Sequence, residues 1–243
     1  MRRWLLPVLR WALAAPAGAG VVASTPWVGA LAQAAGAPQV TVIAPASLVH
    51  PPDYDPRPSD LLAVAGASHV LSGGYEGFAA RLADAAGSQA VVLTVRTSYE
   101  PAVLEAELLR LGAQFGTLPA AQRSVEQLRA QWDVARRALA AAQVGQPAPR
   151  VAVHRFMQPW VALLGVAPVA VYGPGPLSPA QLGRLAALRP TLVLDNAHDP
   201  QGAPLAEASG ARLLRLVNFP SPEQDLADVI RANTARLQQA FDR

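Results

Sequence analysis

Short apolar runs alternate with helical segments along most of this chain, and that alternation restricts the folds available to it. Predicted strands occupy residues 21–24, 40–44, 70–71, 90–95, 151–153, 169–171, 191–194 and 212–216. Predicted helices between them occupy residues 25–35, 59–67, 73–85, 101–112, 156–164, 178–188, 204–209 and 225–241. A strand that is repeatedly followed by a helix favours a parallel sheet covered by helices.

One helical segment, residues 119–143, is much longer than the others and divides the alternating pattern in two. Within it Leu128, Trp132 and Leu139 recur at helical spacing, and the segment Gly145–Pro149 ends it. We therefore expect an α/β protein with two small parallel-sheet lobes joined by a long connecting helix. Ligands of such sheets bind at the carboxyl ends of the strands, so the predicted ligand cleft lies between the lobes.

The N-terminus has the pattern of an export signal. Met1–Trp4 carries two arginines, Leu5–Ala15 is mostly apolar, and small residues follow at 17–19. The chain has no cysteine, which excludes disulfides, thiolate metal ligands and a lipid-anchored cysteine. We expect a periplasmic or secreted protein with a cleaved signal peptide, and not a lipoprotein. The predicted divisions are a signal peptide at 1–19, an N-terminal lobe at 20–118, a connecting helix at 119–145 and a C-terminal lobe at 146–243.

The charge and motif content argue against several classes of function. All twenty basic residues are arginine, they are scattered, and the net charge is only +3, so the chain lacks a basic run of the nucleic-acid-binding type. The sequence has no Gly-x-Ser-x-Gly, Gly-x-x-x-x-Gly-Lys or His-Glu-x-x-His motif, and it offers neither cysteine nor lysine as a nucleophile. We therefore expect a binding protein that is not an enzyme and does not bind nucleic acid.

Several segments with distinctive composition follow one another along the chain. The proline-rich segment His50–Asp60 follows the predicted strand at 40–44, and Gly73–Phe78 comes next. Val151–Phe156 opens the second half of the chain, and the closing helix carries Asn233. Together these segments resemble the metal-type (zinc/manganese) periplasmic solute-binding proteins of bacterial ABC importers.

The resemblance implies a function for the predicted cleft. A protein of this type captures a divalent metal ion, zinc or manganese, outside the cytoplasm and delivers it to the membrane permease subunit of an ABC importer. It acts as a monomer and holds the metal between its lobes with imidazole and carboxylate side chains, which are ligands that suit both metals.

Only one of the four ligand positions implied by the resemblance carries a typical ligand. His154 stands at the third position, whereas Pro52, Arg96 and Asn218 stand at the first, second and fourth. Arginine keeps its proton and cannot bind a metal ion. His50, two residues before Pro52, is the imidazole nearest to the first position. We therefore predict His154 and His50 as metal ligands. The other residues expected to line the cleft are Asp53, Arg96, His198 and Asn218.

The missing ligands leave a second hypothesis open. The chain can be a diverged relative without metal binding, which recognises a metal chelate, an anion or a protein partner. Arg96 would then pair with a carboxylate or a phosphate. A small hydrolase or lyase that uses His154 is a third hypothesis, although no nucleophile is evident.

The candidate residues also have structural interpretations. His154 can be a buried structural histidine, Arg96 can be an ion-pair residue of the surface, and residues 196–200 have the composition of a turn. The residues expected to be structural are Ser59 and Asp60 as helix caps, His69, Glu76, and Trp132 and Trp160 in the core.

Overall fold

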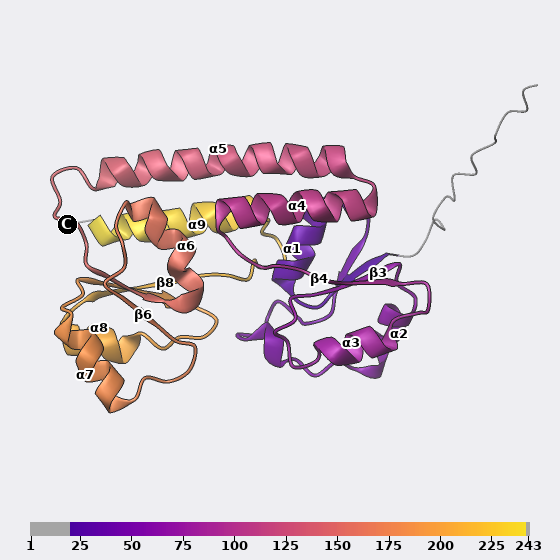
Figure 1. Cartoon of the computed structure of the whole chain (residues 1–243), viewed down its shortest axis with the longest axis horizontal. Helices are drawn as coiled ribbons and strands as arrows, with labels where there is room; N and C mark the ends of the chain where they lie inside the picture. Colours follow the sequence, from indigo (N-terminus) through magenta and orange to yellow (C-terminus); the bar gives the residue numbers. More distant parts are fainter. Residues whose placement is uncertain (1–19, 242–243) are drawn as a thin grey trace, which may run out of the picture.

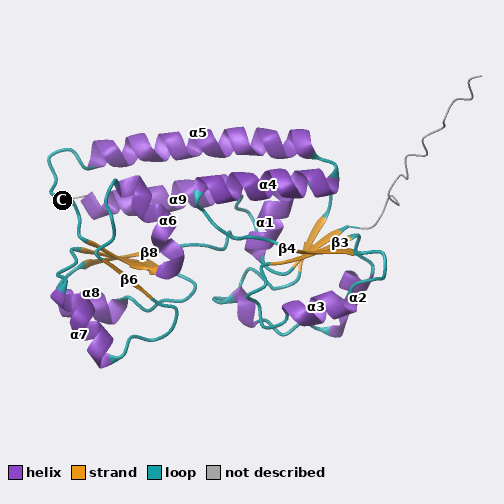
Figure 2. Ribbon diagram, in the orientation of Figure 1, coloured by secondary structure: helices purple, strands orange, loops and turns teal. Residues whose placement is uncertain are grey.

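Two parallel β-sheets, one in each half of the chain, form the framework of the protein (Figure 2). The structure, a computed structural model, describes residues 20–241. The predicted signal peptide, residues 1–19, lies outside the described residues. Each sheet has four strands, and all neighbouring strands are parallel. The predicted α/β class with two parallel-sheet lobes is confirmed.

The sheet of the N-terminal lobe has the strand order β2-β1-β3-β4. Its strands are β1 (Val21–Ala23), β2 (Val40–Val42), β3 (His69–Ser72) and β4 (Val91–Thr94). Its helices are α1 (Pro26–Ala34), α2 (Pro58–Ala65), α3 (Ala79–Ala85) and α4 (Pro101–Phe115), with a 3₁₀ turn at Pro51–Asp53. Helices α2 and α3 lie below this sheet, and α1 and α4 lie above it (Figure 1).

The sheet of the C-terminal lobe repeats this pattern with the order β6-β5-β7-β8. Its strands are β5 (Val151–His154), β6 (Ala170–Tyr172), β7 (Leu192–Asn196) and β8 (Arg212–Leu216). Its helices are α6 (Gln158–Val161), α7 (Pro179–Ala187), α8 (Ala203–Ser209) and α9 (Leu226–Gln238), with 3₁₀ turns at Arg155–Met157, Ala162–Leu164 and Gln239–Phe241. In both lobes the first strand is an inner strand, so the loop that follows it opens at the middle of the sheet.

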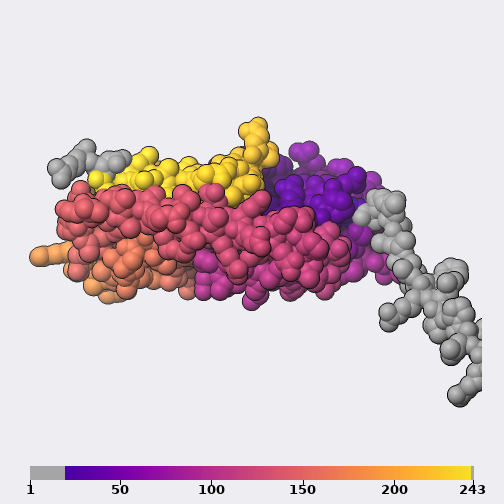
Figure 3. Space-filling view, turned by 90° about the horizontal axis from the view of Figure 1, so that it is seen from above, coloured from indigo at the N-terminus to yellow at the C-terminus, as the bar shows by residue number. Residues whose placement is uncertain are grey.

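Helix α5 (Leu118–Ala142) lies above both lobes and connects them (Figure 1). Its 25 residues extend about 37 Å at a rise of about 1.5 Å per residue. It packs against α4 of the N-terminal lobe and against α9, which lies beside it in the view from above (Figure 3). The long helix predicted at residues 119–143 is thus confirmed within one residue at each end. None of the helices in residues 20–241 is long and apolar enough to cross a membrane.

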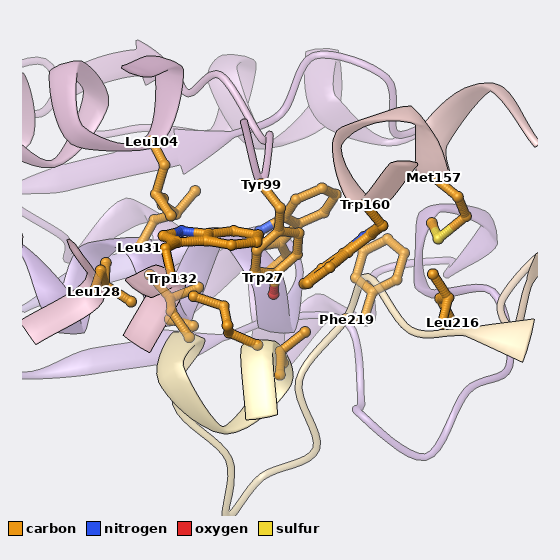
Figure 4. Packing of buried hydrophobic residues seen from close by; sticks show 14 of the residues in the cluster. Trp27, Leu31, Tyr99, Leu104, Leu128, Trp132, Met157, Trp160, Leu216 and Phe219 are labelled. Atoms are coloured by element: carbon orange, nitrogen blue, oxygen red, sulfur yellow. The ribbon is translucent and has the colours of Figure 1, made fainter. Parts of the chain in front are cut away.

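One hydrophobic core extends through both lobes, with a column of aromatic rings at its centre (Figure 4). The rings of Trp27 and Tyr99 are stacked with their centroids 5.0 Å apart. Trp160 lies 5.1 Å from Tyr99 and 5.2 Å from Trp132. Because these rings come from the N-terminal lobe, from α5 and from the C-terminal lobe, the column crosses the joint between the lobes. The prediction that Trp132 and Trp160 are core residues is confirmed.

The helix predicted at residues 73–85 is wrong in its first half, because α3 begins only at Ala79. Gly74 has a φ of +79°, which a helix does not allow. The buried carboxylate of Glu76 accepts hydrogen bonds from the Ser24 hydroxyl and, at 2.9 Å, from the Gly73 N–H. These bonds fix residues 73–78 as a turn, so Glu76 has a structural role outside the helix.

Two other local predictions also need correction. Helix α2 begins at Pro58 with Arg57 as its N-cap residue, so Ser59 is not the cap. Asp60 does stabilise the helix start, since its carboxylate accepts a hydrogen bond of 2.7 Å from the Arg57 N–H. The helix predicted at residues 156–164 is divided into α6 and the two 3₁₀ turns that flank it.

The N-terminal cap of α7 allows the assignment of helix caps to be tested. Ser178 and Gln181 form a capping box, in which each side chain accepts a hydrogen bond from the backbone N–H of the other residue, at 3.3 and 2.9 Å. Ser178→Ala should lower the free energy of unfolding by about 1 kcal/mol. Ser59→Ala is the matched control with an expected loss below about 0.5 kcal/mol, because Ser59 does not cap its helix. Equal losses in urea unfolding would contradict the assignment.

Candidate ligand cleft between the lobes

A cavity with a volume of about 810 Å³ opens between the lobes. Its walls come mainly from loops that follow the carboxyl ends of the strands, where open α/β sheets bind ligands. Of the predicted cleft residues, His50, Asp53, His198 and Asn218 line the cavity, and Arg96 is not among its lining residues. His154 lies behind the wall, with its Nε2 3.5 Å from the Oδ2 of Asp199, which does line the cavity.

The N-terminal lobe contributes an imidazole–carboxylate pair to the cavity. His50 Nδ1 lies 2.8 Å from Asp53 Oδ2. Between them Pro51 and Pro52 are buried and form the 3₁₀ turn, so the loop is anchored by its prolines. The side chains of His50 and Asp53 remain 41% and 80% exposed and are therefore accessible to a ligand.

The C-terminal lobe contributes a second such pair, formed by His154 and Asp199. His154 is the last residue of β5 and is fully buried. Its Nδ1 accepts a hydrogen bond of 3.3 Å from the Phe156 N–H, so the proton of the neutral ring is on Nε2. Within the described residues that Nε2 makes no hydrogen bond, and the carboxylate oxygen that it faces is Asp199 Oδ2 at 3.5 Å. Burial lowers the pKa of His154, although the neighbouring Asp199 and Asp195 carboxylates raise it in part.

The backbone of Gly173 allows the His154 ring to occupy this position. Gly173 has a φ of +72°, and a Cβ at this residue would lie only 2.5 Å from His154 Nε2. Any side chain here would therefore be strained and would collide with the ring. The backbone of Gly173 thus packs directly beside Nε2 of His154.

Asp199 is oriented by neighbours that follow β7. The Gln201 side chain donates a hydrogen bond of 2.8 Å to Asp199 Oδ1, which leaves Oδ2 for His154. The Gln201 N–H donates to the buried carboxylate of Asp195 at 3.1 Å, and the Tyr172 hydroxyl donates to the same oxygen at 3.0 Å. The loop that carries Asp199 is therefore tied to β6 and β7 through Asp195.

His198 and Asn218 connect the two lobes. His198 Nδ1 donates to the Val49 carbonyl at 3.1 Å, and its Nε2 accepts from the Phe219 N–H at 3.4 Å. Both ring nitrogens of His198 are thus in use, and burial lowers its pKa. The Asn218 carbonyl accepts a hydrogen bond of 3.0 Å from the Tyr99 hydroxyl, while Asn218 Oδ1 is buried without a partner within the described residues.

Arg96 forms an ion pair away from the cavity. Its backbone N–H and its Nε donate to the two carboxylate oxygens of Glu107 at 3.1 and 3.2 Å. Glu107 is fully buried and also binds Arg110. Arg96 therefore fits the structural interpretation, in which it is an ion-pair residue with an exposed side chain.

Sequence reasoning missed several residues of the cleft. Asp195 and Gln201 orient Asp199, and the side chains of Arg155, Phe156 and Tyr75 line the cavity. Arg155 and Phe156 could have been predicted from their position in the sequence. They follow the predicted strand at 151–153 and thus lie at the carboxyl edge of the sheet. Within residues 20–241, no group of three or more His, Asp or Glu side chains is close enough together to hold a metal ion.

The comparisons with known proteins place the fold. No protein-family model and no curated protein matches this sequence. Solved structures do match, and one is the laminin-binding protein Lbp of Streptococcus pyogenes, with a TM-score of 0.67 and 15% identity over 92% of this chain and 98% of that chain.

Two further matches were solved with metal ions. The SBP FpvC of Pseudomonas aeruginosa in complex with Ni²⁺ has a TM-score of 0.68 and 17% identity over 91% of this chain and 94% of that chain. The Mn-bound periplasmic metal binding protein of Candidatus Liberibacter asiaticus has a TM-score of 0.66 and 12% identity over 91% of this chain and 99% of that chain. The chain therefore has the two-lobed fold of these proteins, as the resemblance to metal-type solute-binding proteins predicts.

Proposed function

We propose that this chain is an extracytoplasmic solute-binding protein that captures a divalent metal ion in the cleft between its lobes. It would act as a monomer, without catalysis, and deliver the metal to the permease of an ABC importer. Zinc and manganese are the expected metals. The fold shared with metal-bound solved structures supports the class of function.

The observation that carries the proposal is the pairing of imidazole with carboxylate on each side of one cavity. His50 and Asp53 form the pair of the N-terminal lobe, and His154 and Asp199 form the pair of the C-terminal lobe. Two histidines with two carboxylates are a suitable donor set for zinc or manganese. Cargo held by both lobes would stabilise the closed arrangement that the Val49–His198 hydrogen bond already supports.

The spacing within the C-terminal pair suits a bound ion. Two ligand atoms on one tetrahedral zinc, each about 2.1 Å from it, are separated by about 3.4 Å. His154 Nε2 and Asp199 Oδ2 are 3.5 Å apart. The 2.8 Å between His50 Nδ1 and Asp53 Oδ2 is shorter than this separation, so the two atoms must move apart before both can bind the ion.

Capture at His154 has a consequence for the ring proton. A metal ion on Nε2 replaces the proton there, and the neutral ring then carries its proton on Nδ1. Nδ1 now faces the Phe156 N–H, and two donors cannot face each other. The 3₁₀ turn at Arg155–Met157 must therefore shift when metal binds. Movement of this turn back to its metal-free position would favour release of the metal ion.

Thermal unfolding of the metal-stripped protein tests the proposal. Zinc or manganese at about 100 times its dissociation constant should stabilise the native state by about 2.7 kcal/mol, which raises the midpoint by about 5–10 °C for a chain of this size. His154→Ala should weaken metal affinity by about tenfold or more and reduce that shift, because it removes one of the two imidazoles.

The matched control is His69→Ala. His69 is a histidine of the N-terminal lobe that contacts Ser68 and Phe115 and does not line the cavity. This variant should keep the full metal-dependent shift. A protein that shows no shift with either metal, or whose shift survives His154→Ala unchanged, would contradict metal capture at this site.

A second candidate function is the recognition of a metal-free anion. It is favoured by the Arg155 guanidinium, which lines the cavity without an ion-pair partner within residues 20–241 and can pair with a carboxylate. In this case the midpoint would rise with a small carboxylate alone and would not respond to metal.

A further inference from the structure

The volume of the cleft is larger than a bare ion requires. The cavity of about 810 Å³ falls within the range of about 300–1,000 Å³ that is typical of sites for organic ligands. A metal ion with ligands at about 2.1 Å would occupy only a small part of that space. The remaining volume has room for organic groups around the ion.

Aromatic side chains from both lobes line the cavity. Tyr75 of the N-terminal lobe is 44% exposed, and Phe156 of the C-terminal lobe is 47% exposed, and both line the cavity. Trp27, Tyr99 and Phe219 line it as well. Aromatic faces that are left accessible at a cleft are suited to a flat organic ligand.

The charges on the cavity wall have both signs. Asp53 and Asp199 provide carboxylates, and Arg155 provides a guanidinium that has no ion-pair partner within residues 20–241. An unpaired arginine disfavours a bare cation nearby. A ligand with its own carboxylate would pair with Arg155 and leave the metal facing Asp199.

Several buried polar atoms at or beside the cavity make no hydrogen bond within the part of the chain that the structure describes. Asn218 Oδ1 is an acceptor and His154 Nε2 is a donor, and both residues are at most 3% exposed. Buried polar atoms without hydrogen bonds are uncommon and point to a ligand or an ordered water.

We propose that the cleft binds its divalent metal as a complex with a small aromatic carboxylate chelator, in which Arg155 pairs with a carboxylate of the chelator and Tyr75 and Phe156 pack on its ring. This inference rests on the proposed function, since it concerns the same cleft and adds the chemical class of the cargo. The metal of the complex lies toward His154 and Asp199, and the chelator fills the mouth.

Equilibrium dialysis of the metal-stripped protein tests this inference with three probes. They are zinc chloride, free pyridine-2,6-dicarboxylate, and the one-to-one zinc complex of that dicarboxylate. Zinc and the ultraviolet absorbance of the dicarboxylate are measured on the protein side. We expect both to be retained in equal amounts from the complex, with an affinity at least about tenfold higher than for free dicarboxylate.

Variants separate the chelator from the ion. Arg155→Gln should weaken binding of the complex by about tenfold, because a charged pair to the carboxylate is lost. The same variant should bind zinc chloride as well as or better than the native protein, because a repelling charge is gone. Phe156→Ala should also weaken the complex. Arg123→Gln, an exposed position on α5 outside the cavity, is the control and should change neither affinity.

The outcomes distinguish the two proposals. Retention of zinc without dicarboxylate would overturn the chelate inference and leave metal capture standing. Equal retention of the dicarboxylate with and without zinc would overturn the chelate inference and favour the metal-free anion. Retention of neither zinc nor the complex would overturn both proposals.

Discussion

Replacing Trp160 with alanine should lower the free energy of unfolding by about 3–5 kcal/mol, which is the range for a large aromatic side chain removed from a core. Trp160 is fully buried and contacts the rings of Tyr99 and Trp132 at centroid distances of 5.1 and 5.2 Å. It fills the joint where α5 meets both lobes, so its removal opens a void that neither lobe alone can close. The loss would be a large part of the total stability of about 5–15 kcal/mol expected for a folded domain.

Urea unfolding at neutral pH measures this effect, and Leu62→Ala is the control. Leu62 is 75% exposed on α2, so its replacement should change stability by less than about 0.5 kcal/mol. If Trp160→Ala lowers the free energy of unfolding by less than about 1 kcal/mol, the residues around the joint repack and fill the space that the side chain leaves. The shared core would then not hold the lobes together as described.

The second large effect concerns Glu107, whose carboxylate is buried between two arginines. Burial by itself raises the pKa of Glu107, but the hydrogen bonds from Arg110 and Arg96 outweigh it and lower the pKa below the usual 4.5. Because the pKa is lower in the folded state, the stabilisation is complete above the pKa of the unfolded chain. It is lost as the pH falls through the folded-state pKa.

Glu107→Gln should therefore cost about 1.5–3 kcal/mol at pH 7, the range for hydrogen bonds to a charged group. The arginine side chains are 62% and 37% exposed, so water can hydrate them after the substitution and the cost stays below that of a fully buried pair. Urea unfolding at pH 7 and again between pH 3 and pH 5 measures both the loss and its pH dependence. The difference in the free energy of unfolding between the native protein and the variant should be smaller between pH 3 and pH 5 than at pH 7.

The control for Glu107 is a carboxylate that pairs at the surface. Glu105 binds Arg129, whose side chain is 62% exposed, so Glu105→Gln should cost less than about 1 kcal/mol. Equal losses in the two variants would contradict the role of burial. A constant difference down to pH 3 would contradict the lowered pKa of Glu107.

The strength of the hydrophobic pattern determined which elements could be predicted. The long helix at 119–143 and the strand at 212–216 agree with α5 and β8 because their patterns extend over the whole element. The helix predicted at 73–85 was wrong at its start because Glu76 forms hydrogen bonds with Ser24 and Gly73, one of them with a residue far away in the sequence. Local propensity does not contain such contacts.

In the candidate site, too, the features set by the local sequence were predicted and those set by tertiary contacts were not. The ends of the predicted strands indicated where the loops around His50 and His154 lie, because the loops that follow parallel strands all lie at the carboxyl edge of the sheet. The pairing of His154 with Asp199 depends on the loop after β7, and the position of Arg96 depends on Glu107 in α4. Both are tertiary contacts, so the family resemblance predicted Arg96 in the cleft although its guanidinium binds Glu107.

Helix α9 follows both sheets in the chain, although it completes the core that both lobes share. Leu226, Val229 and Ile230 of this helix belong to the same hydrophobic cluster as Trp27 and Trp132, and α9 packs along α5. A nascent chain that has finished both sheets therefore still exposes the part of α5 that α9 covers. Chaperones would therefore meet this chain with part of its shared core open until α9 has emerged.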